Sequence, residues 1–105
     1  MKPVVTSLLL NLEVLGRVVF SVAEFSRATV QANVVNGSWG ATVLTVRRSN
    51  NQWDFNALES ATTLTASGIT AELDTEGYAF LAVDVTTVAG AAAHAQITVC
   101  RKTEA

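Results

Sequence analysis

The chain of 105 residues has one cysteine and one histidine, and these counts exclude several kinds of site. Cys100 cannot form an intrachain disulfide, which fits a protein made in a reducing cytoplasm. A His/Cys metal cluster would need ligands from more than one chain. A Ser–His–Asp triad would depend on His94, which lies between alanines in an expected strand, with no sharp turn to present a nucleophile. We therefore expect His94 to be an ordinary surface or interface residue.

Charged residues are also scarce. They make up 15% of the chain, against about 25% in an average soluble domain. The formal net charge is −2, so the chain lacks the basic excess that displaces counterions from nucleic acid. No apolar run approaches the ~20 residues of a membrane-spanning helix, and Asn11, Glu13 and Arg17 interrupt a signal-peptide-like N-terminus. We expect no nucleic-acid or membrane partner, and a surface that protein partners partly cover.

Acidic side chains are the remaining route to chemistry. Glu72, Asp74 and Glu76 lie close together and could bind Ca²⁺ through carboxylate and backbone oxygens, but their spacing matches no known calcium loop. The simpler interpretation is that Asp74 stabilises its own turn. Glycoside hydrolysis needs two carboxylates across a cleft, for which so short a chain offers little room. The sequence therefore predicts no metal, no cofactor and no catalytic residue.

Half of the residues are apolar, and they alternate with polar ones along segments rich in β-branched residues, which is typical of strands. A first strand is expected from Val4 to Leu15. It would reverse at residues 16–17 through a type II′ turn and form a hairpin that pairs Leu10 with Ala23.

A second hairpin is predicted at Asn36 and Gly37, the residue pair most typical of a type I′ turn, with Val34 opposite Trp39. Further strands are expected at residues 53–55, 62–66, 69–74, 78–87 and 93–101, with a single helical turn within 56–61. In the last of these strands, Ala95, Ile97 and Val99 would face inward.

About eight short strands separated by regular turns predict an all-β fold: an antiparallel two-sheet β-sandwich. We expect one domain over residues 1–105, with residues 102–105 as a free tail. Asp74, Gly77 and Tyr78 resemble the tyrosine corner of immunoglobulin-like sandwiches, although the Cys–Trp–Cys pattern of that fold is absent. A jelly-roll-like connection of the strands is equally compatible with the pattern.

Three segments are similar to small β-sandwich virion proteins of tailed bacteriophages: WGATVLTVRRSN at residues 39–50, LTASGIT at 64–70 and GYAFLAVDV at 77–85. The resemblance implies a structural virion protein, most often a capsid decoration or cement protein and less often a neck or tail accessory protein. It implies many copies, as trimers or dimers, on the major capsid protein of a virion assembled in the host cytoplasm. It implies no catalytic residue, so we do not expect an enzyme.

Candidate interaction residues lie mainly near the N-terminus. The apolar strand with Val4, Val5, Leu8, Leu9 and Leu10 could add to the sheet edge of a neighbouring subunit, or belong wholly to its own sandwich. Residues 1–25 would then contribute to contacts between subunits.

Aromatic residues provide the other candidates, with Trp53 and Phe80 as interaction residues. The alternative function is a glycan-binding or host-surface-binding module, in which Trp39, Trp53 and Tyr78 would serve as stacking platforms.

Overall fold

The computed structural model describes residues 3–50, 62–75 and 77–103. Within these ranges the chain forms strands and no helix, as its β-branched, alternating segments favour. The strands are β1 (Val4–Asn11), β2 (Arg17–Ser21), β3 (Arg27–Asn36), β4 (Val43–Ser49), β5 (Thr62–Leu64), β6 (Thr70–Asp74), β7 (Phe80–Thr87) and β8 (His94–Lys102).

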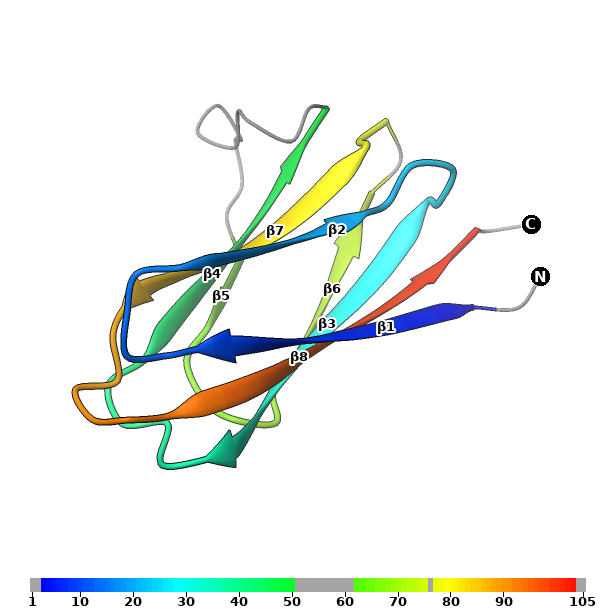
Figure 1. Cartoon of the computed structure of the whole chain (residues 1–105). Coiled ribbons are helices and arrows are strands. Elements are labelled where there is room, and N and C mark those ends of the chain that lie inside the picture. The colour runs from blue at the N-terminus through cyan, green and yellow to red at the C-terminus, as the bar shows by residue number, and fades with distance from the viewer. Residues whose placement is uncertain (1–2, 51–61, 76, 104–105) are drawn as a thin grey trace.

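These strands form two four-stranded sheets (Figure 1). Sheet A has the order β1-β8-β3-β6, and sheet B has the order β2-β7-β4-β5. All pairs are antiparallel, and they are nested: the first strand pairs with the last, the second with the seventh, the third with the sixth and the fourth with the fifth. This order is that of a jelly roll. An immunoglobulin-like sandwich would keep its first two strands in one sheet, so the predicted two-sheet sandwich is confirmed with jelly-roll connectivity.

The first predicted hairpin is wrong. Leu10 lies opposite Ala95 of β8, not opposite Ala23, and β2 pairs with β7 in the other sheet. Residues 12–16 therefore carry the chain from sheet A across to sheet B. Gly16 also lacks the positive φ that a type II′ turn requires at its first central position. The glycine marks a change of direction, but a turn signal does not tell whether the chain returns to the same sheet.

The second predicted hairpin is wrong for a related reason. β3 pairs with β6 and β8, while β4 pairs with β5 and β7, so Val34 and Trp39 are not cross-strand neighbours. Gly37 does have a positive φ of 81°. A Cβ there would lie 2.2 Å from the carbonyl oxygen of Ala92. The glycine thus permits a close approach between the β3–β4 and β7–β8 connections at one end of the sandwich.

The later strands follow the sequence prediction more closely. The predicted strands at 62–66, 69–74, 78–87 and 93–101 correspond to β5, β6, β7 and β8, each with bounds that differ by up to two residues. The prediction that Ala95, Ile97 and Val99 face inward is confirmed, because all three are fully buried. β8 continues through Lys102, so the predicted tail starts too early. The predicted strand at 53–55 and helical turn within 56–61 lie outside the described residues.

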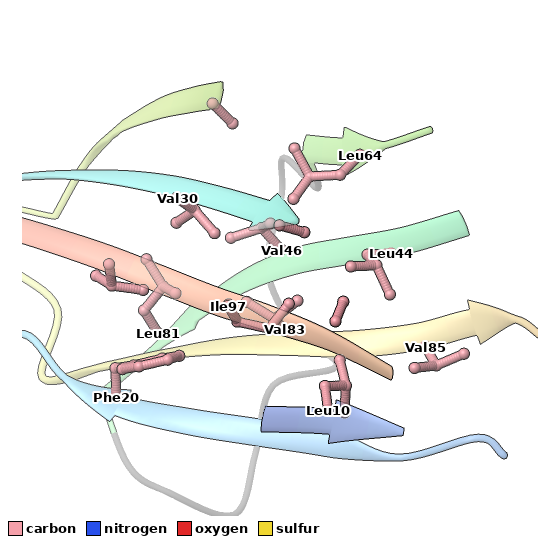
Figure 2. Close-up of a cluster of buried hydrophobic side chains, with 14 of the residues drawn as sticks. Leu10, Phe20, Val30, Leu44, Val46, Leu64, Leu81, Val83, Val85 and Ile97 are labelled. Atoms are coloured by element: carbon pink, nitrogen blue, oxygen red, sulfur yellow. The ribbon is translucent and has the colours of Figure 1, made fainter. Parts of the chain in front are cut away.

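The hydrophobic core lies between the two sheets and receives side chains from both (Figure 2). Sheet A contributes Leu10, Val30 and Ile97, and sheet B contributes Phe20, Val46 and Leu81, among others. Several of these side chains are fully buried. The same alternation that fills the core turns the intervening side chains outward, so the outer faces of the sheets carry whatever surface chemistry the protein has.

Candidate functional site: the apolar edge

β1 is an end strand of sheet A and lies beside β8 (Figure 1). Among the described residues, β8 is the one strand that pairs with β1, so the backbone groups on the far side of β1 have no strand partner there. β1 is eight residues long and its sequence, VVTSLLLN, carries no charge. Soluble proteins normally protect exposed sheet edges with charges, with bulges or by keeping the strand short.

Four large apolar side chains of β1 are exposed to solvent. The exposed fractions are 43% for Val4, 61% for Val5, 40% for Leu8 and 62% for Leu9, whereas Leu10 is 5% exposed and packs in the core. Val5 and Leu9 face outward, but Val4 and Leu8 share the inward face with Leu10. Figure 1 shows β1 and β2 joined at the connection over residues 12–16 and diverging toward the termini. The inward face of β1 is therefore covered at Leu10, whereas Val4 and Leu8 stay partly exposed on it.

The connection after β1 extends this apolar surface, since Val14 is 53% exposed and Leu15 is 73% exposed. The structure describes eight exposed large hydrophobic residues, and six of them fall within residues 4–15. We call these six residues the apolar edge: Val4, Val5, Leu8, Leu9, Val14 and Leu15. The sequence prediction missed the last two, because it placed Val14 on the buried face of a hairpin. Val14 and Leu15 come directly before the turn glycine Gly16, and this position in a connection was the available signal of their exposure.

The outer face of sheet A next to the apolar edge is uncharged. Two rows of cross-strand neighbours run across the sheet from β1: Ser7, Thr98, Gln31 and Thr70 form one, and Leu9, Gln96 and Asn33 form the other. Hydrogen bonds connect the hydroxyls of Ser7 and Thr98 at 3.1 Å, and the Gln31 Nε2 donates to Thr70 Oγ1 at 3.2 Å. Charge-poor surface of this kind is typical of the central part of protein–protein interfaces.

The other edge strands are short or charged. β5 has three residues. β6 carries Glu72, which accepts a hydrogen bond from Arg27 at 2.6 Å. β2 begins at Arg17, which bonds both oxygens of Asp84 on β7, at 2.5 and 2.9 Å. This hydrogen bond raises the pKa of Arg17. Asp84 also accepts from Arg47 of β4 at 3.2 Å, so one carboxylate joins three strands of sheet B.

Two arginines close the end of the sandwich nearest the chain termini. The Arg101 guanidinium lies 5.5 Å from the ring centroid of Phe25 and donates to the carbonyl oxygen of Ser21 at 2.7 Å and to Thr6 Oγ1. The Arg48 guanidinium lies 4.7 Å from the ring centroid of Tyr78. Both contacts are cation–π arrangements that bury the stems of long charged side chains. Tyr78 packs against Arg48 here, and the strand order is the jelly-roll one of the two connections that the sequence left open.

A shallow depression of 750 Å³ lies at this end, lined in part by Phe25, Tyr78 and Glu24. Its described lining holds one carboxylate and no histidine, cysteine or basic side chain. Elsewhere in the described ranges, no three His, Cys, Asp or Glu side chains come close enough to hold a metal ion. His94 is half-buried at the start of β8, opposite Asn11 and Asn36. Cys100 is a free thiol on the outer side of β8.

The aromatic candidates occupy different places. Trp39 is half-buried against the core, and its Nε1 donates to the carbonyl oxygen of Thr42 at 2.8 Å. Phe80 is half-buried on β7, opposite Ser21 and Ser49. Trp53 and Glu76 lie outside the described residues. Trp39 therefore stabilises a connection between strands, and the aromatic residues that the structure describes do not gather into one platform with the apolar edge.

No long apolar helix that could cross a membrane occurs in the described part of the chain.

Comparisons with known proteins show the fold. No protein-family model and no curated protein matches the chain. Among solved structures, the SPBc2 prophage-derived protein YomS matches with a TM-score of 0.69 and 13% identity, over 97% of this chain and 96% of that chain. A protein from Bacillus endospore appendages, described as a family of disulfide-linked pili, matches with a TM-score of 0.48 and 12% identity, over 98% and 90% of the two chains. The chain therefore shares its β-sandwich fold with a prophage-derived protein along nearly its whole length.

Proposed function

We propose that the chain is a structural, non-catalytic protein of a tailed-bacteriophage particle, and specifically a capsid decoration (cement) protein. The observation that carries the proposal is the apolar edge: six exposed apolar residues, four of them on an uncharged end strand, in a chain that has few charges overall. A surface of this kind is stable when another protein covers it. The shared fold with a prophage-derived protein and the sequence resemblance to small virion proteins support the phage context.

The mechanism follows from binding thermodynamics. A protein that binds the assembled shell, and not its dissociated subunits, stabilises the shell by mass action. Many copies on a repeating lattice need only modest affinity per contact, because linked contacts raise the overall avidity. The proposed partners are the major capsid protein and other copies of this chain, and the proposed location is the virion, assembled in the host cytoplasm. No step of this mechanism needs a catalytic group, a cofactor or a metal.

Co-sedimentation of the purified chain with empty, expanded shells of the phage that encodes it tests the proposal. We expect saturable binding with a fixed number of copies per capsomer, and a higher temperature of shell disruption when the chain is bound. Binding to isolated necks or tails instead of shells would favour the alternative of an accessory protein. Binding to neither would remove the proposal, and retention on a glycan array would then favour a host-surface-binding module.

A further inference from the structure

The proposed function requires that another protein cover β1, and the structure points to which one. We propose that β1 pairs, antiparallel and about a two-fold axis through Ser7, with β1 of a second copy of this chain. The inference rests on the proposed function, since it identifies the partner at the same assembly contact. It joins the two A sheets into one continuous eight-stranded sheet.

Charge favours a second β1 over the other edge strands of a neighbouring copy. β1 has no charged residue, so two β1 strands oppose only apolar and hydroxyl-bearing side chains. Pairing β1 with β6 would bring Val5 or Leu9 against the Arg27–Glu72 ion pair and remove water from those charges. β2 carries Arg17, which is paired with Asp84 of β7, and β5 is only three residues long. A neutral apolar strand is best matched by another neutral apolar strand.

Symmetry also favours β1 with β1. A contact between two different edges is heterologous and leaves one edge of each copy unpaired until a ring closes or a filament grows, whereas a contact between identical edges closes after two copies. β1 is the strand with the unprotected apolar edge in the described part of the sandwich. Joining two β1 strands therefore covers this edge in both copies and leaves the charged strands at the outside.

Side-chain geometry favours one register. A two-fold axis perpendicular to the sheet keeps the outward faces of both copies on the same side, so an outward-facing residue must lie opposite another outward-facing residue. An axis through Ser7 places Ser7 opposite the same residue of the second copy. It also places Val5, 61% exposed, opposite Leu9, 62% exposed, on both sides of the axis. An axis through Thr6 would instead place Leu9 opposite Pro3, which has no backbone N–H to pair.

The size of the contact sets the expected strength. One strand edge covers less than the ~800 Å² per partner of a standard interface, so we expect a dimer in the micromolar range. Val14 and Leu15 follow β1 and lie outside the paired residues, so they stay available for contacts with the shell.

Sedimentation velocity over a concentration series is the first test. We expect a reversible dimer for the wild-type chain, and at least a tenfold larger dissociation constant for Leu9→Lys, because the lysine would lie in the apolar contact. Ile69→Lys is the matched control, since Ile69 is also exposed (44%) and lies before β6 at the opposite edge. The control should form dimers like the wild type. Circular dichroism melting of all three proteins shows whether each variant is folded.

Cysteine cross-linking tests the register in a Cys100→Ser background. Ser7→Cys should give a disulfide-linked dimer under mild oxidation, because residues directly opposite have Cβ atoms about 5 Å apart. Leu9→Cys should not, because two copies of residue 9 would lie about 13 Å apart along the strands. Equal cross-linking of both variants would contradict the register.

Two results together would overturn the inference. The wild-type chain would stay monomeric at ~100 μM, well above a micromolar dissociation constant, and the Ser7→Cys variant would give no disulfide-linked dimer. If that monomer still binds shells, the proposed function stands and only the self-pairing fails. If the chain forms the dimer but does not bind shells, the self-pairing stands and the decoration role fails.

Discussion

Single residues hold the sandwich together at its ends, and Gly37 is the clearest case. Its φ of 81° and the 2.2 Å separation between a Cβ and the Ala92 carbonyl oxygen leave no room for a side chain. The positive φ predicted for Gly37 is confirmed, but the type I′ turn is wrong, because Asn36 belongs to β3 and has no positive φ. The contact of Gly37 with a segment more than fifty residues away could not be predicted. Local turn chemistry reports backbone conformation and carries no information on what packs against the turn.

Gly37→Ala should lower the free energy of unfolding by about 2 kcal/mol or more, from the left-handed conformation and the clash together. Gly90→Ala is the matched control, because Gly90 has a similar φ of 86° and nothing within 4 Å of its added Cβ. It should cost about 1 kcal/mol, the conformational part alone. Urea denaturation measures both values, and equal losses would contradict the close approach of the two connections.

Asp84 is the second residue whose role can be tested. It lies between Arg17 and Arg47, and its side chain is 13% exposed. Asp84→Asn should lower the free energy of unfolding by about 1–2 kcal/mol, because two partly buried guanidinium groups lose their carboxylate. The exposed Arg27–Glu72 pair (side chains 38% and 54% exposed) is the control, and Glu72→Gln should cost less than about 1 kcal/mol. A larger loss for Glu72→Gln than for Asp84→Asn would contradict this assignment.

The pH dependence of this ion pair has a definite sign. The folded protein raises the pKa of Arg17 above an ordinary value that is already high. A raised pKa gives stability that is fully present below the unfolded pKa and is lost as the pH rises through the folded pKa. The contribution of the Arg17 charge should therefore stay constant between about pH 5 and pH 9. Urea denaturation of the wild type and an Arg17→Gln variant at both pH values measures this contribution. A difference in their free energies of unfolding that changes between the two pH values would contradict the assignment.

Secondary-structure elements show which parts of the fold a sequence can predict. The strands at the C-terminal half were predicted almost at their observed bounds, and the inward face of β8 was confirmed, because alternation over eight or nine residues identifies a half-buried strand. Both predicted hairpins were wrong. Successive strands of a jelly roll mostly lie in different sheets, so the pairing depends on contacts distant in sequence, such as Leu10 with Ala95. Alternation determines which side chains face the core, but it does not determine the neighbouring strand.

The apolar edge was predicted only in part, because alternation gives the face on which a residue lies and not what covers that face. Leu10 was predicted as an interaction residue together with its neighbours, and this was wrong, because its side chain is buried in the core. The exposure of Val4 and Leu8 on the inward face could not be predicted, since it depends on how far the facing sheet covers β1. No feature of the local sequence distinguishes an inward position that the facing sheet covers from an inward position that it leaves uncovered.

Neighbouring leucines of β1 test this element directly. Leu10→Ala should lower the free energy of unfolding by about 2–4 kcal/mol, because Leu10 is buried in the core. Leu9→Ala should change it by less than about 0.5 kcal/mol in dilute monomer, because Leu9 faces solvent there. Guanidinium denaturation at low protein concentration provides the comparison. Similar losses at both positions would mean that Leu9 is covered within its own chain.

The whole molecule is a charge-poor jelly roll whose described apolar exposure gathers along one edge, and this distribution determines how its assembly should respond to salt. An uncharged contact gains little from Coulomb attraction, so screening should affect it weakly. We expect the dimer dissociation constant to change less than about threefold between about 50 mM and 500 mM NaCl. Sedimentation velocity at the two salt concentrations measures this change. A much weaker dimer at high salt would indicate that charged groups make the contact instead.

The central claim is that another protein covers β1 when the chain is assembled into a particle. Hydrogen–deuterium exchange of the β1 amides measures this coverage, with dilute monomer compared against chain bound to the shell. We expect peptides containing residues 4–9 to exchange at least about tenfold more slowly in the particle, because the edge amides gain strand partners. Unchanged exchange in these residues, together with protection at another face, would contradict it.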